Sequence, residues 1–179
     1  MKIGIDLDTT LVKLPCIDIA SEELGYTFKE QDNLDWNFSI FPENLRQRVY
    51  QMFADPEIMC DKVSPLEGSQ DKIKQWKELG HEMVLITARI SEIRPKTIKM
   101  VNRLYPEIEN INFVGFNESK LNSMLDLEID FWIDDSATGV LDSLNLGIKT
   151  YMISNKYTRY NWHLRDRVEW FKAVKDISL

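Results

Sequence analysis

Acidic and hydroxyl side chains end short apolar runs at several points of the sequence, and a lysine begins the helix predicted before the last of these runs. The residues are Asp6, Asp8, Thr87, Lys120, Asp134 and Asp135. Carboxylates that lie close together repel one another, so a cluster of them needs a cation, and hard oxygen ligands suit Mg²⁺. Lys120 and the Thr87 hydroxyl would add a positive charge and a hydrogen-bond donor for a substrate phosphate. The set therefore predicts phosphate chemistry beside a magnesium ion.

The spacing of the first two aspartates suits the transfer of a phosphoryl group. Asp6 can attack phosphorus and form an acyl-phosphate, which splits hydrolysis into two easier steps. Asp8 lies two residues further on, and in a strand that spacing places both side chains on one face. A carboxyl group in this place can protonate the leaving oxygen and then take a proton from the attacking water.

The elements that must position these residues are strands that alternate with helices. Residues 2–8 alternate, with Ile3, Ile5 and Leu7 facing one way and the two aspartates facing the other. Continuous apolar runs predict further buried strands at 83–87, 111–114, 129–133 and 148–153. Apolar spacings of three and four predict helices between the strands, and a last helix over roughly residues 162–175. The pattern indicates an α/β fold, a doubly wound Rossmann-like parallel sheet with helices on both faces.

Residues 13–65 interrupt this alternation, and they are too many for a simple crossover between strands. A structureless loop of that length is uncommon in a compact domain, so we expect a small helical cap inserted after the first strand. The predicted division is an α/β core domain at 1–12 and 66–179, with the cap at 13–65. The cap aromatics Trp36 and Phe38, together with Arg89, are candidates for the substrate pocket, where a base would stack. The alternative for the aromatics is the small core that any helical cap needs.

Composition and charge exclude several kinds of partner. Of 179 residues, 44% are hydrophobic and 28% are charged, which is ordinary for a globular protein. The net charge of −7 argues against a nucleic-acid polymer or an acidic membrane as partner, because both need a basic surface. The two cysteines suggest no disulfide framework or zinc site. We expect a cytoplasmic protein, because the sequence shows no membrane span and no signal peptide.

The motifs resemble those of a known superfamily of phosphatases. Asp6-Leu7-Asp8-Thr9-Thr10, Leu85-Ile86-Thr87, Lys120 and Ile133-Asp134-Asp135 are similar, in order, to the four motifs of the haloacid dehalogenase superfamily. Within it the chain resembles the 5'(3')-deoxyribonucleotidases, because the cap follows the first motif directly and Pro65-Leu66-Glu67-Gly68 leads into a helix.

The resemblance implies a function and a role for each motif residue. It implies a magnesium-dependent phosphomonoesterase that hydrolyses a nucleoside or deoxynucleoside 5'- or 3'-monophosphate through an aspartyl-phosphate, and a homodimer as one assembly to test. The implied roles are Asp6 as nucleophile, Asp8 as acid and base, Asp6, the Asp8 carbonyl and Asp134 as metal ligands, Thr9, Thr87 and Lys120 at the phosphate, and Asp135 in support of the metal.

Two positions depart from the pattern of that family. Thr9 stands where glycine is frequent, and a β-branched residue is strained there if its φ is positive. Arg89 follows Thr87-Ala88, where many members have serine and proline, and we expect it to contact the substrate or the cap.

Other functions remain as alternatives. The same chemistry could serve a sugar phosphate or another small phosphometabolite, since the shape of the cap decides the substrate. A catalytically silent phosphate-binding protein could have the same fold. A phospho-accepting receiver module is disfavoured because the order of its acidic motifs differs and it has no place for the insertion. The base, the sugar and the position of the phosphate are not specified by the sequence.

Overall fold

The sheet at the centre of the molecule is parallel and six-stranded. The computed structural model describes residues 1–26, 38–39, 41–116, 118–155 and 159–179. Along the sheet the strands are β5 (Asn110–Phe113), β4 (Glu82–Thr87), β1 (Lys2–Ile5), β6 (Phe131–Asp134), β7 (Lys149–Ile153) and β8 (Glu169–Phe171). The predicted α/β fold with a parallel sheet is confirmed.

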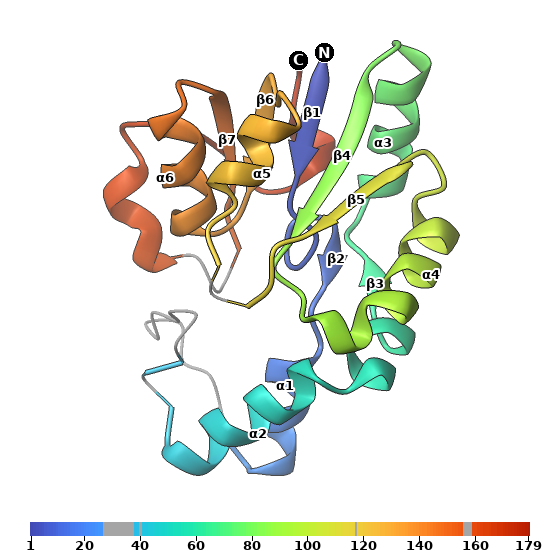
Figure 1. Cartoon of the computed structure of the whole chain (residues 1–179). Helices are drawn as coiled ribbons and strands as arrows, with labels where there is room; N and C mark the ends of the chain where they lie inside the picture. The colour runs from blue at the N-terminus through green and yellow to red at the C-terminus, as the bar shows by residue number, and fades with distance from the viewer. Residues whose placement is uncertain (27–37, 40, 117, 156–158) are drawn as a thin grey trace.

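Helices cover both faces of this sheet (Figure 1). On one face, α3 (Ser69–Glu78) and α4 (Arg94–Leu104) pack in the same apolar cluster as Ile3 and Ile5 of β1. On the other face, α5 (Leu121–Asp126) packs against Trp132, and α6 (Ala137–Asn145) packs against β7. Burial on both sides explains why the strands read as continuous apolar runs.

The order of the strands changes direction beside β1. The chain passes from β1 to β4 and β5 on one side, and then crosses to β6, β7 and β8 on the other. Ile5 is in register with Leu85 of β4 and with Ile133 of β6. Ligands of such sheets bind at the carboxyl ends of the strands where the order reverses. Here that place is the rim where β1 and β6 end.

The insertion leaves and rejoins the core through a short pair of strands. β2 (Val12–Lys13) and β3 (Ser64–Pro65) are antiparallel, so the two ends of the insertion lie side by side. Between them lie α1 (Cys16–Glu23), α2 (Glu43–Phe53) and a π-helical turn over Glu57–Asp61. Both helices stand below the carboxyl ends of the sheet in Figure 1. Two helices thus lie within residues 13–65, the segment for which a helical cap is expected.

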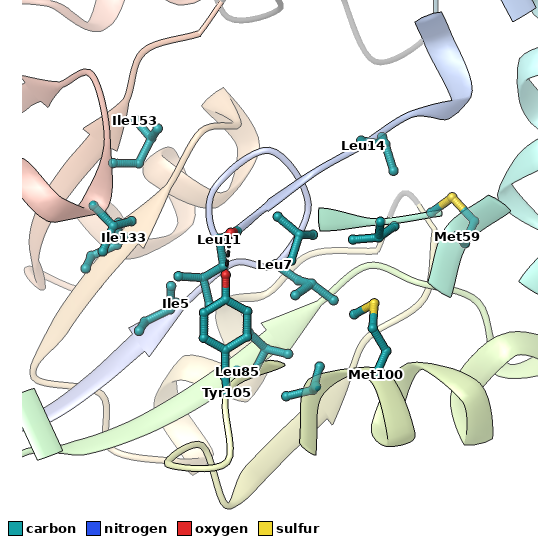
Figure 2. Packing of buried hydrophobic residues seen from close by; sticks show 14 of the residues in the cluster. Ile5, Leu7, Leu11, Leu14, Met59, Leu85, Met100, Tyr105, Ile133 and Ile153 are labelled. Atoms are coloured by element: carbon teal, nitrogen blue, oxygen red, sulfur yellow. Dashed lines mark hydrogen bonds between the residues drawn. The ribbon is translucent and has the colours of Figure 1, made fainter. Parts of the chain in front are cut away.

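The apolar core continues from the sheet towards the insertion. Figure 2 shows Ile5, Leu85 and Ile133 of the sheet near Leu7 and Leu11 of the loop that follows β1. Tyr105 donates a hydrogen bond of 2.5 Å to the Leu11 carbonyl, and burial raises the pKa of its hydroxyl to about 12. The hydroxyl therefore stays a donor, and it fixes the loop that carries the first acidic motif.

The prediction of a helix over residues 162–175 is wrong. The structure has short 3₁₀ helices at Arg159–Leu164 and Val174–Asp176, with strand β8 between them. Val168 and Trp170 pack on one face of the sheet while Phe171 packs on the other, which is the period of a strand. Pairing with the edge of β7 decides the outcome. No helix in the described part of the chain has the length and apolar character that a membrane crossing requires.

Candidate active site

Three carboxylates gather at the rim where β1 and β6 end. Asp6, Asp134 and Asp135 each offer an oxygen, and these oxygens all lie within 4.8 Å of one another. All three side chains are buried. Asp6 follows β1 and its backbone N–H donates to the Ile133 carbonyl, so the ladder of the sheet holds it beside β6. The parallel sheet thus brings together aspartates that are far apart in the sequence.

Lys120 places its ammonium group among these carboxylates. Its Nζ lies 2.5 Å from Asp6 and 2.9 Å from Asp134, and it stands over the Trp132 ring at 5.1 Å from the centroid. The backbone N–H of Lys120 donates to the Asp142 carboxylate of α6 at 2.9 Å. Although burial lowers the pKa of Lys120, the carboxylates of Asp134 and Asp6 raise it above its ordinary value. The lysine is therefore a fixed positive charge.

Within the part of the chain that the structure describes, the Lys120 ammonium group alone does not balance the three carboxylates. Burial raises the pKa of Asp6 to about 7 despite the opposing charge of Lys120, and the carboxylates of Asp134 and Asp8 contribute. Burial, with the charges of Asp6 and Asp134, raises the pKa of Asp135 well above its usual range. A divalent cation among these oxygens would remove that penalty. A set of hard carboxylate oxygens fits Mg²⁺ better than a softer metal.

The first turn of α6 wraps around Asp134. Ser136 caps the helix by accepting from the Gly139 N–H at 3.2 Å, and its own backbone N–H donates to Asp134 Oδ1 at 2.8 Å. A Cβ atom at Gly139 would lie only 1.8 Å from Asp134 Oδ2. Gly139 is therefore required for the position of the Asp134 carboxylate. Because Ser136 is the capping residue, the Asp135 carboxylate is left for the acidic cluster.

Thr9 contacts Asp135 through its hydroxyl, and its backbone is strained. Its φ of 64° lies in the left-handed region, which a β-branched residue seldom adopts. The Thr9 hydroxyl donates to Asp135 Oδ2, and the Asn155 amide donates to the same oxygen at 3.2 Å. The Asn161 amide donates to the Asp135 carbonyl at 3.0 Å. Thr9 therefore supports the acidic cluster, and its expected contact with phosphate remains a prediction.

Asp8 is engaged by Arg89. The guanidinium Nε lies 2.9 Å from Asp8 Oδ2, and Nη2 lies 2.7 Å from Asp8 Oδ1. The Arg89 side chain is 1% exposed and that of Asp8 is 17% exposed. Thr87 is fully buried, and its hydroxyl accepts the backbone N–H of Arg89 at 3.3 Å. The Asp8 carboxylate thus pairs with Arg89 and does not belong to the cluster of Asp6, Asp134 and Asp135.

A cavity of about 190 Å³ opens over these groups. Its polar wall includes Asp6, Asp8, Lys120 and Asp134. Its apolar wall is formed by Leu14, Phe53, Met59, Ile90 and Phe116. The apolar residues come from the cap and from the loops that follow β4 and β5. Such a cavity suits a molecule with a charged group at one end and an apolar ring at the other.

Of the two aromatic residues expected in the pocket, the structure describes only Phe38. Trp36 lies outside the described residues. Phe38 is fully buried and stacks on Phe41 and Phe53, with ring centroids 5.9 Å and 5.7 Å away. That arrangement agrees with the alternative that the cap aromatics form a small core, whereas Phe53 and Phe116 are the aromatic residues that line the described cavity.

Comparison with known families gives the identity of this site. Residues 1–178 match the model of the 5' nucleotidase, deoxy (pyrimidine), cytosolic type C protein family. The chain belongs to this family. It is therefore a phosphoric monoester hydrolase of the nucleotidase type, and its substrate is a small phosphate ester. The expected membership of the haloacid dehalogenase superfamily is confirmed.

Individual relatives agree with the assignment to this nucleotidase family. A candidate nucleotidase of Oceanobacillus iheyensis is 23% identical over 98% of both chains. A candidate nucleotidase of Bacillus cereus is 25% identical over 99% of this chain and 97% of its own. The crystal structure of a candidate haloacid dehalogenase-like hydrolase from Bacteroides fragilis has a TM-score of 0.67 at 14% identity, over 98% of each chain. That last likeness supports the fold.

Sequence reasoning found the acidic residues of this nucleotidase and missed their supports. Asp6, Asp134 and Lys120 meet as expected, and Asp135 joins them directly. Gly139 and Asn155 were missed because glycine and asparagine in loops and helix turns carry no distinct signal by themselves. Asp142 was missed as well, although its position on α6 places it beside Lys120.

Proposed function

We propose that this nucleotidase is a magnesium-dependent enzyme that hydrolyses a deoxyribonucleoside 5'- or 3'-monophosphate through an aspartyl-phosphate on Asp6. The observation that carries the proposal is the buried Asp6 carboxylate, which shares the Lys120 ammonium group with Asp134 and lines a cavity that also has an apolar wall. The net charge of −7 favours free mononucleotides over a nucleic-acid polymer, which needs a basic surface.

The metal would be held by Asp6, Asp134 and Asp135, with the Asp8 carbonyl as a further ligand. Bound Mg²⁺ would supply positive charge to the carboxylates and to the phosphate of the ester. Lys120 adds a fixed ammonium group on the same side. Contacts of Thr9 and Thr87 with the phosphate stay predictions. In the structure the Thr9 hydroxyl donates to Asp135, and the Thr87 hydroxyl accepts from the backbone N–H of Arg89.

The reaction assigns different tasks to Asp6 and Asp8. A carboxylate oxygen of Asp6 forms a bond to phosphorus while the bond from phosphorus to the ester oxygen breaks. The electron pair of the broken bond stays on the ester oxygen, which takes a proton from the Asp8 carboxyl group. Water then attacks the phosphorus and gives a proton to Asp8, and the bond from phosphorus to Asp6 breaks. Inorganic phosphate leaves, and both aspartates return to their first state.

The apolar wall supports a nucleoside rather than an open-chain sugar as the leaving group. Phe53 and Phe116 are in ring contact, with centroids 5.6 Å apart, and both line the cavity. A base that stacks on an aromatic side chain gains roughly 1–3 kcal/mol per contact. A sugar phosphate offers no such ring, so it would gain less from this wall.

The test is phosphate release from a panel of nucleoside monophosphates and sugar phosphates, with and without Mg²⁺. We expect magnesium-dependent release that favours deoxynucleotides, and no turnover by Asp6→Asn. Asp126→Asn is the matched control, because Asp126 is exposed on α5. Preference for sugar phosphates would overturn the nucleotide assignment, and an active Asp6→Asn enzyme would overturn the role of Asp6.

A further inference from the structure

Arg89 is a buried cation whose nitrogen atoms all have partners. Nε and Nη2 form two parallel bonds to the Asp8 carboxylate, at 2.9 and 2.7 Å. Nη1 donates to the Thr97 hydroxyl at 3.3 Å and lies 3.6 Å from the Cys60 sulfur. Asp8 belongs to the loop after β1, Thr97 to α4, and Cys60 to the π-helical turn of the insertion. One side chain thus joins the Asp8 carboxylate to two other elements.

The geometry of this pair restricts Asp8 more than charge alone would. A guanidinium is planar and presents its donors as a rigid fork, which fixes the plane of the carboxylate it binds. Lysine can supply the same charge but only as a single point. Burial of a charged group carries a large desolvation penalty, which only good geometry and further hydrogen bonds offset. The contacts to Thr97 and Cys60 hold the fork itself.

We propose that Arg89 is the positioning residue that sets the Asp8 carboxyl group for proton transfer to the leaving oxygen. This inference rests on the proposed function, in which Asp8 gives that proton. The bond from phosphorus to the ester oxygen breaks, its electron pair stays on that oxygen, and the Asp8 proton neutralises it. Arg89 neither touches the ester nor exchanges a proton. It fixes the plane of the Asp8 carboxyl group beside the cavity, which Asp8 and Arg89 both line.

The role predicts a dependence on the leaving group. Phenyl phosphate and p-nitrophenyl phosphate have similar shapes, but p-nitrophenolate is a weak base and departs without a proton. The constant kcat/KM reports the steps up to departure of the leaving group, so the later reaction with water does not enter it. Arg89→Lys should lower kcat/KM about 30-fold for phenyl phosphate and for a deoxynucleotide, and less than about 3-fold for p-nitrophenyl phosphate.

Two further variants guard against a general loss of structure. Thr97→Val removes the hydroxyl that accepts the hydrogen bond from Nη1. It should lower kcat/KM for phenyl phosphate more than for p-nitrophenyl phosphate, as Arg89→Lys does, but by a smaller factor. Arg48→Lys is the matched control, because Arg48 forms a similar two-bond pair with Glu23 on the surface, at 2.7 and 3.1 Å. It should leave the ratio between the two esters unchanged. An equal loss on both esters in Arg89→Lys would overturn the inference, since a merely structural role predicts that result.

A double-mutant cycle on a deoxynucleotide decides the matter even if the aryl esters are poor substrates. If Arg89 acts through Asp8, Arg89→Lys should reduce kcat/KM of an Asp8→Asn enzyme less than about 3-fold. Additive losses would mean that Arg89 acts elsewhere, and would overturn the inference. A wild type that releases phosphate from none of these esters would instead overturn the proposed function, so the two failures are distinct.

Discussion

The active site has two halves that treat negative charge in opposite ways. In the metal half, Asp6, Asp134 and Asp135 lie together, and among the described residues the one ammonium group that pairs with them is that of Lys120, which contacts Asp6 and Asp134. In the proton half, Asp8 has the whole guanidinium of Arg89. The first half carries an excess of buried negative charge, and the second is balanced.

The difference shows what each half is built to do. Burial, together with the charges of the neighbouring carboxylates, raises the pKa of Asp6 and Asp135, and this marks a place that gains from a divalent cation. A balanced pair gains nothing from a further cation, but its two-bond geometry fixes direction. The two halves can therefore be damaged separately, one through the metal and the other through proton transfer.

Gly139→Ala should break the metal half most severely. The new Cβ would need the space of Asp134 Oδ2, at 1.8 Å, so the carboxylate must move. We expect a fall of about 100-fold in kcat/KM and an increase of about 10–100-fold in the Mg²⁺ concentration needed, which is typical when support of a ligand is lost. Magnesium titrations of phosphate release and calorimetry of Mg²⁺ binding would measure both. Asn145→Ala, at the exposed end of α6, serves as control, and an unchanged Mg²⁺ requirement would refute the role of Gly139.

Stability against pH should sharpen the contrast between the halves. The pKa of Asp6 rises from 3.8 to about 7 on folding, so the folded state binds more protons between these values. Its contribution is therefore favourable at low pH and is lost as pH rises through that window. Without Mg²⁺, the free energy of unfolding should fall between pH 5 and pH 7 by about 2 kcal/mol more in wild type than in Asp6→Asn.

Urea unfolding of both proteins at the two pH values would measure this difference. Addition of Mg²⁺ should raise the midpoint of the wild type at pH 7 more than at pH 5. Parallel pH dependence in wild type and Asp6→Asn would contradict the excess of charge in the metal half.

Two substitutions of Thr9 give the smallest predicted effect. Thr9→Ala loses the hydroxyl that donates to Asp135 and keeps the positive φ of 64°, so it should destabilise by about 1–2 kcal/mol. Thr9→Gly loses the same hydrogen bond but relieves the backbone, so it should cost about 1 kcal/mol less than Thr9→Ala. Urea unfolding would rank the two variants. If Thr9→Gly were the less stable, the backbone at Thr9 would carry no strain.

The acidic residues could be predicted because strand ends are visible in the sequence. Asp6 and Asp134 close runs of apolar residues, and parallel strands place such ends on one rim. The pairing of Asp8 with Arg89 was not visible, since it depends on the path of the loop after β4. The need for glycine at position 139 was not visible either. It depends on the atomic packing beside Asp134, which spacing along the chain does not encode.

Pairing at the edge of the sheet explains the wrong prediction at the C-terminus. The apolar residues Leu164, Val168, Phe171 and Val174 have helical spacing, but β8 pairs with the edge of β7, which would otherwise be open. Phe171 is in register with Ile153 of β7 and packs against the ring of Tyr151, with centroids 4.8 Å apart. Pairing with β7, a strand distant in the sequence, therefore outweighs the helical periodicity of the apolar residues.

The reaction of Asp8→Asn with p-nitrophenyl phosphate and Mg²⁺ tests the division between the halves most directly. The metal half would remain able to transfer the phosphoryl group to Asp6, because this leaving group needs no proton. Water would then react slowly, because Asp8 no longer takes its proton. We predict a burst of p-nitrophenolate equal to the amount of enzyme, and a phosphoryl group on the peptide that contains Asp6 in mass spectra of acid-quenched samples. Linear release without a burst, with Asp6 unmodified, would contradict the account.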